Sequence, residues 1–418
     1  MKKDHLLFFC NYRPSSSFNE SVFISNELKF LKDNFSSLNI IPTMDLLNDY
    51  KPEEGIILGY SAKRKKKILS KIFCYFFYSF TSVYFYKEIL SNFNILLNID
   101  KLARLIIFLG IAKGFNKWLK NYLKCNNVSV DSLILYTYWF CPITFGCALL
   151  KKHYPNITVI SRAHGFDLYA ERQKIAYKPC RSFLFSLIDK VYTVSDDGKY
   201  YLECNYPKYS YKIETARLGT SLPDFSCKIS TDGIFRVVSC SSIIPVKRVP
   251  LLAKVLCKVA EKNIDRKIIW THIGDGIERE KVMIETQSFP SNLHCKFHGN
   301  ISNEEVFSFY KNNPVDVFIN VSCYEGIPVS IMEAQSCGIP VVASSVGGIP
   351  EIVNNNNGFL VPYESKVKTI SEIIITFMQL PVDELEKKRF FSKKIHFEKN
   401  NAEKNFLNFI TSLKKFND

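Results

Sequence analysis

Residues 324–348 read YEGIPVSIMEAQSCGIPVVASSVGG, and this stretch decides the fold. Pro328 suits the first position of a helix, because its missing N–H is not needed there, and Gly338 suits the end of that helix. The apolar runs Val315–Asn320 and Ile339–Ala343 on either side have the length and composition of buried β-strands. The stretch therefore predicts a strand–helix–strand unit whose helix begins beside the end of a strand.

Two glutamates, Glu325 and Glu333, frame this helix start. Backbone N–H groups around 326–329 would point toward the strand ends, with the positive end of the helix dipole behind them, which suits a phosphate. Two nearby carboxylates are also found as the acid/base pair of a glycoside hydrolase. A hydrolase places its pair across the scissile bond, whereas this pair shares one helix start beside a predicted phosphate site, which argues against a hydrolase.

The rest of the chain repeats apolar runs bounded by turn residues, with helical periodicity between them, as in residues 245–262 and 302–313. The other predicted strands are Leu6–Cys10, Asn39–Pro42, Ser132–Tyr136, Thr158–Ser161, Lys190–Val194, Phe235–Ser239 and Lys267–Ile273. Alternating strands and helices predict parallel sheets covered on both faces, an α/β class. The turn-rich stretch 218–233 separates two doubly wound domains, and ligands of such sheets bind at the carboxyl ends of strands.

Two further stretches in the second half are typical of anion sites. In CSSIIPVKRVPLL (240–252), a strand ends in serines, and Lys247 and Arg248 open a helix. In WTHIGDG (270–276), a strand runs into a turn at Gly274. Taken alone, each stretch is better explained by an ordinary structural role, as a solvated helix start or a simple turn.

The composition indicates the cellular compartment in which the protein works. Thirteen cysteines form no CxxC pair, which disfavours a disulfide framework or a zinc site and favours a reducing, cytoplasmic compartment. The apolar run Leu6–Cys10 is too short for a signal peptide. The longest uncharged stretch, Ile72–Tyr86, has 15 residues, fewer than the roughly 20 that a spanning helix needs.

The positive charge is concentrated in the first half of the chain. Residues 60–124 hold 13 basic and 2 acidic residues, and an apolar stripe with helical spacing runs through 68–84. Basic residues beside aromatic amphipathic helices suit an anionic membrane surface. The alternative is that the stripe faces the domain core and the lysines are only solvated. No nucleic-acid-binding motif is present, so no nucleic acid partner is expected.

In combination these stretches resemble the retaining, nucleotide-sugar-dependent glycosyltransferases of family 4, which have the two-domain GT-B fold. The matching elements are EGIPVSIMEA (325–334), GIPVVASSVGGIPEIV (338–353), SSIIPVKR (241–248), IGDG (273–276), SRAHGFDLY (161–169), IDKVYTVSDDG (188–198) and RLGTSLP (217–223). Residues 15–32 are similar to the acceptor-side loop and helix of capsule, exopolysaccharide and O-antigen transferases.

The resemblance implies two Rossmann-like domains facing a central cleft: an acceptor domain over residues 1–220, a donor domain over 221–395, and a C-terminal helix, 396–418, that crosses back. It implies transfer of a hexose or N-acetylhexosamine, with retention, from a nucleotide-diphosphate sugar, UDP in preference to GDP. The basic first half of the chain adds a hypothesis for the acceptor: a glycan linked to lipid through polyprenyl diphosphate, at the inner face of the cytoplasmic membrane. Since the sequence contains no D-x-D element, neither a metal nor another cofactor is expected.

The resemblance also assigns roles to residues. Glu325 would bind the donor sugar, Glu333 the ribose, and His164 would stabilise the transition state, so that His164, Lys247 and Glu325 form the catalytic set. The remaining donor-binding residues would be Ser242, Gly274, Gly326, Ile327, Pro328 and Val329. The family usually has Arg at the position of Ser242, which leaves Arg248 as a substitute, or Lys247, Ser242 and backbone groups alone. The second is favoured here, because Arg248 would lie on another helical face.

Acceptor contacts are less sharply indicated. Tyr138 and Trp139 follow a strand and would either stack on sugar rings or simply pack, and Glu27 is a further candidate. Three functions compete at this stage: a transferase extending a cell-surface glycan; a nucleotide-sugar epimerase or sugar phosphorylase on the same fold; and a binding scaffold with a decayed site. The joint presence of His164, Lys247, Glu325 and Glu333 argues against decay.

Overall fold

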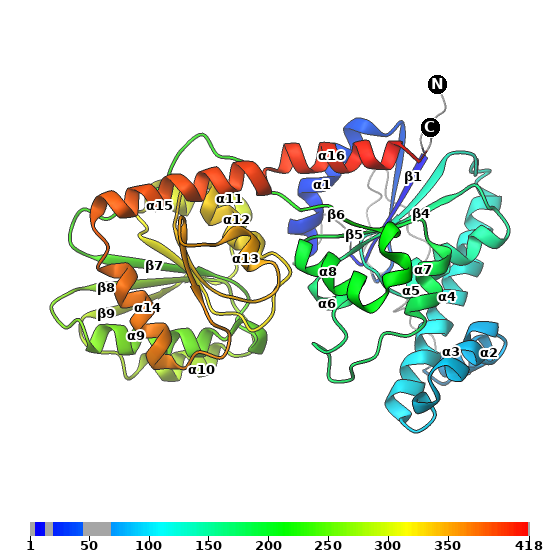
Figure 1. The fold of residues 1–418 in the computed structure, drawn as a ribbon, viewed down its shortest axis with the longest axis horizontal. Coiled ribbons are helices and arrows are strands. Elements are labelled where there is room, and N and C mark those ends of the chain that lie inside the picture. Colours follow the sequence, from blue (N-terminus) through cyan, green and yellow to red (C-terminus); the bar gives the residue numbers. More distant parts are fainter. Residues whose placement is uncertain (1–4, 13–19, 45–67, 417–418) are drawn as a thin grey trace. The chain divides into compact units, whose positions relative to one another are not determined.

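The computed structural model divides the chain into two compact units, each described by itself (Figure 1). Unit 1 comprises Met1–Ala216 and Phe406–Asp418, and unit 2 comprises Arg217–Asn405. The residues that the structure describes are 5–12, 20–44 and 68–416. The predicted boundary after residue 220 lies a few residues beyond this division. The C-terminal segment that was predicted to begin at 396 enters unit 1 from Phe406 onward.

Unit 1 is built on a parallel six-stranded sheet in the order β2-β1-β3-β4-β5-β6. Its strands are β1 (His5–Cys10), β2 (Ser37–Pro42), β3 (Leu133–Thr137), β4 (Thr158–Ala163), β5 (Lys190–Thr193) and β6 (Ile213–Thr215). Its helices and short helical turns are α1 (Glu20–Asn34), α2 (Ile68–Phe80), α3 (Val83–Ser91), η1 (Phe93–Ile95), α4 (Ile99–Cys125), α5 (Pro142–Ala148), η2 (Leu149–Lys152), α6 (Gly165–Leu168), α7 (Arg181–Leu187), α8 (Asp196–Asn205), η3 (Pro207–Lys212) and, from unit 2, α16 (Ala402–Lys414).

Helices cover both faces of this sheet, which explains its continuous apolar strands. Successive side chains of a strand point to opposite faces, so Leu6 and Phe8 pack in one core with α1 and α16. Leu7 and Phe9 pack in the other core, with α4 and α5.

Unit 2 repeats the design with a second parallel sheet, in the order β12-β11-β10-β7-β8-β9. Its strands are β7 (Phe235–Cys240), β8 (Ile268–Ile273), β9 (Leu293–Phe297), β10 (Val317–Asn320), β11 (Val341–Ser344) and β12 (Gly358–Val361). Its helices are η4 (Pro245–Lys247), α9 (Val249–Glu261), α10 (Arg279–Thr286), α11 (Asn303–Asn312), α12 (Val329–Ser336), α13 (Ile349–Ile352), α14 (Val367–Met378), α15 (Val382–Ile395) and the π-helical turn η5 (His396–Asn400).

The opening stretch forms the predicted strand–helix–strand unit, β10–α12–β11. Pro328 is the N-cap and not the first helical residue, so the helix begins one residue later than predicted, at Val329. Gly338, with φ +76°, takes the left-handed conformation that ends it. Two doubly wound parallel sheets confirm the predicted α/β class. Within the described ranges, no helix combines the length and the apolar character that crossing a bilayer requires.

Candidate active site

The candidate donor site lies where the chain reverses direction across the sheet of unit 2. Strand β7 is formed first, β8 and β9 extend the sheet on one side, and β10 to β12 extend it on the other. The loops that leave β7 and β10 therefore diverge at the carboxyl edge, the switch point at which sheets of this kind bind a ligand in a crevice. These loops are residues 241–248 and 321–328, the two stretches that sequence reasoning singled out.

An ion pair joins the two loops. Lys247, in η4, donates from Nζ to Oε1 of Glu325 over 2.6 Å. The Glu325 side chain is 9% exposed and that of Lys247 is 23% exposed, so a ligand in the crevice can still reach the ammonium. Asn320, at the end of β10, lies 3.5 Å from the same carboxylate oxygen and was not predicted. The structure thus brings together two residues that are 78 positions apart.

Glycines let the neighbouring loops approach closely. Gly274 has φ +127°, and a Cβ there would lie 2.0 Å from the carbonyl oxygen of Ser241. The loop that contains Ser242 is held against residues 274–276, since Ile243 N–H donates to the carbonyl of Asp275 over 3.0 Å. Ser242 and Gly274 therefore border the same crevice as Lys247.

The start of α12 is clamped by a second glycine that sequence reasoning did not single out. Gly347 has φ +54°, and a Cβ there would lie 2.1 Å from the carbonyl oxygen of Glu325. The N–H of Gly348 donates to the carbonyl of Gly326 over 2.8 Å. These contacts fix the loop that carries Gly326, Ile327 and Pro328 and leads into Val329. The helix dipole of α12 adds a partial positive charge at this end.

Glu333 lies further along α12 and is buried, with an exposed fraction of 5%. Its Oε1 accepts a hydrogen bond of 2.5 Å from Nδ2 of Asn303, at the start of α11. Burial penalises the charged form and raises the pKa of Glu333 to about 7, although the bond from Asn303 opposes the shift. The two glutamates of the opening stretch thus have different environments, which does not favour a matched acid/base pair.

Arg248, considered above as a substitute for an arginine at position 242, binds the loop that follows β10. It is the left-handed N-cap of α9, with φ 52°, so the predicted reason, another helical face, is wrong. Its Nε donates to the carbonyl of Val321 over 2.6 Å, and its guanidinium lies 5.4 Å from the ring centre of Tyr363. Arg248 therefore holds the β10 loop, and Lys247 is the cation that pairs with Glu325.

In unit 1, His164 lies at the carboxyl end of β4, in a pocket of aromatic side chains. Its ring centre is 4.6 Å from that of Tyr138 and 4.7 Å from that of Trp139. Neither ring nitrogen has a hydrogen-bond partner in the described structure, and both are shielded from solvent. Desolvation, helped by the nearby charge of Arg162, lowers the pKa of His164 to about 3, so the ring is neutral at pH 7.

Asp167 orients this loop. Its carboxylate accepts bonds of 2.6 Å from the N–H groups of Phe140 and His164, which ties the end of β3 to the end of β4. Burial raises the pKa of Asp167 to about 6, against the lowering effect of these bonds. The HGFD element is thus a capped turn that presents His164.

Glu27 was predicted as an acceptor contact, and the structure corrects this. Its side chain is fully buried. It accepts a 2.7 Å bond from the Tyr136 hydroxyl and pairs at 3.2 Å with Nε of Arg162. Breaking such a buried pair would leave a charge uncompensated, so Glu27 is a structural residue. Of the other predicted acceptor residues, Tyr138 is buried and Trp139 is half-buried, and both pack against His164.

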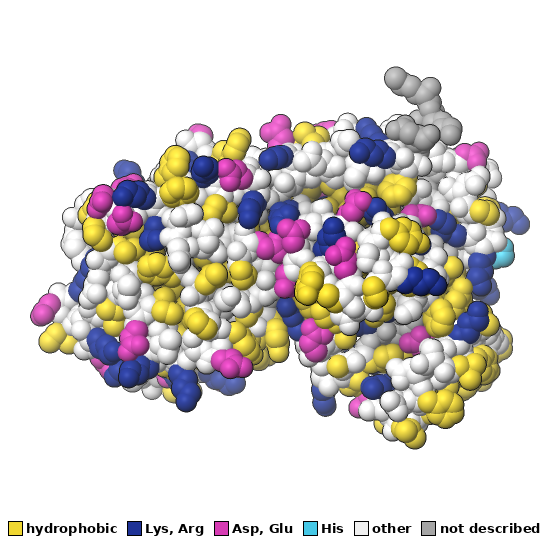
Figure 2. Space-filling model, viewed as in Figure 1, with side chains coloured by type: hydrophobic (Ala, Val, Ile, Leu, Met, Phe, Trp, Pro, Cys, Tyr) yellow, Lys and Arg dark blue, Asp and Glu magenta, His cyan; other side chains and the backbone are white. Residues whose placement is uncertain are grey.

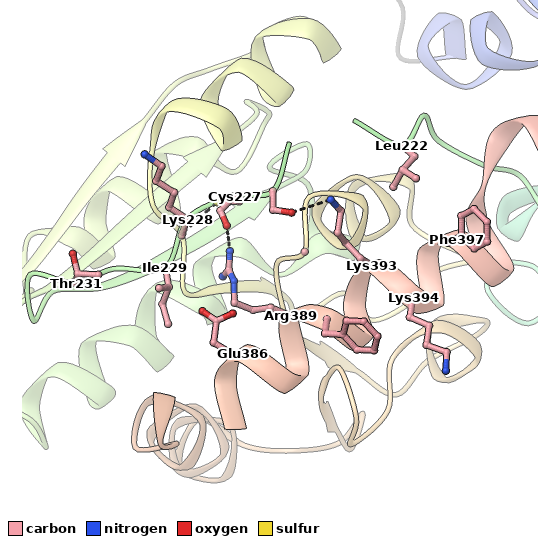
Figure 3. A pocket seen from close by; sticks show the side chains of 13 residues that line it. Leu222, Cys227, Lys228, Ile229, Thr231, Glu386, Arg389, Lys393, Lys394 and Phe397 are labelled. Carbon is pink, nitrogen blue, oxygen red and sulfur yellow. Dashed lines mark hydrogen bonds between the residues drawn. The ribbon is translucent and has the colours of Figure 1, made fainter. Parts of the chain in front are cut away.

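A hollow elsewhere on unit 2 is lined by none of the predicted site residues (Figure 3). It lies between α15 and residues 222–231. Two cations of this hollow bind the chain itself: Arg389 donates to the carbonyl of Cys227, and Lys393 donates to the Ser226 hydroxyl over 2.8 Å. These contacts hold the segment that leads into β7. Among the described residues, no group of three or more His, Cys, Asp and Glu side chains is placed to hold a metal ion.

Comparison with known proteins finds relatives that share parts of this chain. Residues 230–395 match the family described as "Glycosyl transferases group 1". The chain is 27% identical over 232 residues to the putative colanic acid biosynthesis glycosyltransferase WcaL of Escherichia coli K12, a match that spans 53% of this chain and 55% of that protein. It is 29% identical over 270 residues to the O-antigen biosynthesis glycosyltransferase WbnH of Escherichia coli, over 63% of this chain and 72% of that protein.

The fold has a solved counterpart. The lipopolysaccharide outer core galactosyltransferase WaaB superimposes with a TM-score of 0.67 at 15% sequence identity, covering 98% of this chain and 99% of that one. This likeness shows the fold. Together with the family match, it confirms the predicted resemblance to the GT-B glycosyltransferases.

Proposed function

We propose that the chain is a retaining, metal-independent glycosyltransferase, a proposal supported by the match of residues 230–395 to the glycosyl transferases group 1 family. It moves a hexose or N-acetylhexosamine from a nucleotide-diphosphate sugar, UDP in preference to GDP, to a glycan acceptor. No resident cofactor takes part; the nucleotide sugar is a substrate.

The observation that carries this proposal is the ion pair between Lys247 and Glu325 at the switch point between β7 and β10. Departure of a nucleoside diphosphate develops negative charge, which must be met where it forms. Lys247 and the N–H groups at the start of α12 supply positive charge on two sides of the crevice. A diphosphate that engages Lys247 weakens its hold on Glu325 and releases that carboxylate for the donor sugar's hydroxyl groups.

Two further residues complete the reaction. The Glu333 carboxylate accepts from the two ribose hydroxyls, and Asn303 fixes its orientation. His164, neutral and without a partner on its ring nitrogens, donates a hydrogen bond to the donor sugar in the transition state. The acceptor hydroxyl attacks from the face that the diphosphate leaves, and the departing phosphate takes its proton. The new bond therefore keeps the configuration of the donor.

The acceptor class follows from the relatives. WcaL and WbnH are named for colanic acid and O-antigen biosynthesis, so we assign this chain to cell-surface polysaccharide synthesis, with a lipid-linked glycan as acceptor. The chain works in the cytoplasm, peripheral to the inner face of the membrane, whose anionic surface residues 60–124 contact. The run of basic residues at 63–67, part of that prediction, lies outside the described residues.

A panel of nucleotide sugars tests the proposal directly. A bound donor raises the melting temperature of the protein because it binds the folded state alone. We expect one or a few nucleotide sugars to do so, and the same donors to be consumed when a lipid-linked glycan from the matching organism is added. If no nucleotide sugar raises the melting temperature and none is consumed, the proposal fails.

Lys247→Ala tests the residue on which the proposal depends. Removing one preorganised donor to developing negative charge costs about 10²–10³-fold in rate, so kcat/KM of the variant should fall by about that factor. Lys258→Ala is the matched control, because Lys258 on α9 pairs with Glu261 at the surface, over 2.8 Å. An activity of Lys247→Ala within a few-fold of the wild type would contradict the assignment.

A further inference from the structure

The hairpin formed by α2 and α3, with the chain that follows to the start of α4, exposes apolar side chains along its whole length. Figure 2 shows hydrophobic side chains gathered over α2 and α3 at one end of unit 1. The exposed large apolar residues of this segment, termed here the apolar hairpin, are Ile72, Phe73, Phe76, Phe77, Phe80, Val83, Tyr86, Leu90, Phe93, Leu96, Leu97 and Ile99. Exposed apolar patches of this extent mark interaction surfaces in soluble proteins.

The phenylalanine-rich face of α2 is not its packing face. The opposite face holds the helix on α4: a Cβ at Gly110 would lie 2.5 Å from the ring of Tyr75, and the Ser79 hydroxyl donates to the carbonyl of Ile106 over 2.9 Å. Phe73 and Phe77 remain 73% and 57% exposed. The alternative that the apolar stripe of 68–84 faces the domain core is therefore wrong for Phe73 and Phe77.

Charge identifies what covers the patch. Residues 72–124 contain seven basic side chains and two acidic ones, and one of the acids, Glu88, is buried. The basic residues are Lys87, Lys101, Arg104, Lys113, Lys117, Lys120 and Lys124. A second copy of the chain would bring an equal set of cations against these, and like charges oppose association. An anionic bilayer attracts the cations and accepts the aromatic side chains.

We infer that the apolar hairpin inserts Phe73, Phe77 and Leu97 into the boundary between headgroups and acyl chains of an anionic bilayer. This inference deepens the proposed membrane contact and rests on it. It changes the contact from adsorption through lysines to partial insertion of aromatic and aliphatic side chains. Insertion of this kind is driven mainly by apolar burial, which salt does not screen.

The hairpin is also tied to the loop that presents His164. Glu88 of α3 accepts a 2.9 Å bond from the Tyr177 hydroxyl, and Arg104 of α4 donates over 3.1 Å to the carbonyl of Ile175. The same segment returns to the loop, since Lys178 donates to the carbonyl of Phe166 over 2.9 Å. A bilayer that holds the hairpin therefore also fixes the position of the loop that presents His164. The bilayer thereby orients this loop relative to a lipid-linked acceptor.

The test is flotation with vesicles of phosphatidylcholine and phosphatidylglycerol, at low salt and at high salt. The variant is Phe73→Ser with Phe77→Ser. The control is Ile264→Ser with Ile277→Ser, which removes two apolar residues of unit 2 that are 72% and 84% exposed. We expect the wild type and the control to stay bound at high salt. The vesicle partition coefficient of the hairpin variant should fall at least tenfold at both salt concentrations.

Three outcomes would overturn the inference: release of the wild type at high salt, binding of the hairpin variant equal to that of the wild type, or a dimer without vesicles that the hairpin variant converts to monomer. An unchanged melting temperature of the variant shows that it is folded. Donor binding and transfer by the wild type are measured in parallel. Salt-resistant vesicle binding without sugar transfer would contradict the proposed function but not the insertion of the hairpin. Sugar transfer without salt-resistant binding would contradict the insertion but not the proposed function.

Discussion

At the scale of single residues, the raised pKa of Glu333 makes the stability of the protein depend on pH. Its pKa, raised from 4.5 to about 7 by burial, means that the folded protein binds a proton which the unfolded chain releases at lower pH. The stability that this proton contributes is fully present below about pH 4.5 and is lost as pH rises through 7. A neutral carboxyl group is also a poorer acceptor for two hydroxyls than a carboxylate.

Glu333→Gln tests this, because glutamine does not ionise. The free energy of unfolding of the variant minus that of the wild type should increase by about 2 kcal/mol between pH 5 and pH 8. The difference cancels the titration of the buried histidines, which is common to both proteins. Denaturant unfolding at several pH values measures it, with Glu304→Gln, an exposed neighbour of Asn303, as the control. A difference that stays constant with pH would show that Glu333 ionises normally.

The sequence predicted the residues of the donor site, but it did not predict the residues that contact them. Lys247, Gly274, Glu325 and residues 326–329 were placed at one sheet edge, because each follows a predicted strand. The contacting residues could not be predicted, because they depend on how distant segments pack together. Asn303, which binds Glu333, comes from another helix, and the packing that buries Glu27 is a property of the folded core.

At the scale of elements, close backbone approach shapes the site. The loop before α12 can lie where it does only because position 347 has no side chain, since a Cβ there would overlap the carbonyl oxygen of Glu325. The loops after β7 and β8 meet in the same way, at Gly274. The site is thus a set of tightly apposed loops, and its geometry depends on a few glycines.

Gly347→Ala should therefore disturb the site more than another glycine of similar conformation. We expect an affinity for the donor at least tenfold lower and a loss of about 1–3 kcal/mol in the free energy of unfolding, from steric overlap and the unfavourable backbone. Gly233→Ala is matched, because its φ is +76° and nothing lies within 4 Å of the added Cβ. Calorimetric titration with the donor compares them. Equal effects would mean that conformation alone matters at 347.

The strands that sequence reasoning missed are all at sheet edges. They are β6, β9 and β12, and each has neighbours on one side only. Edge strands are part-exposed, so their apolar runs are short or interrupted, as in LHCKF of β9, where His294 and Lys296 are exposed.

The helix predicted over residues 245–262 is divided in the structure into η4 and α9. Pro250 has no N–H to donate to the carbonyl of Val246, which accepts from Cys323 instead.

At the scale of the whole molecule, α16 makes the first unit depend on the last residues of the chain. The helix starts in unit 2, and from Phe406 onward it completes a core of unit 1. Phe409 is 2% exposed, and its ring centre lies 5.4 Å from that of Tyr136 and 5.0 Å from that of Tyr192. The guanidinium of Arg162 lies 4.2 Å from the centre of the same ring.

Phe409→Ala should consequently destabilise unit 1 and spare unit 2. A buried phenylalanine replaced by alanine costs about 3–5 kcal/mol, through lost apolar burial and the cavity that remains. Hydrogen exchange read by mass spectrometry should show faster exchange in β1, β3 and β4, with β7, β10 and β11 unchanged. Leu407→Ala, on the exposed face of the same helix, should change neither set. Equal acceleration in both sheets would mean that the two units unfold together, and that their stabilities are coupled through the chain.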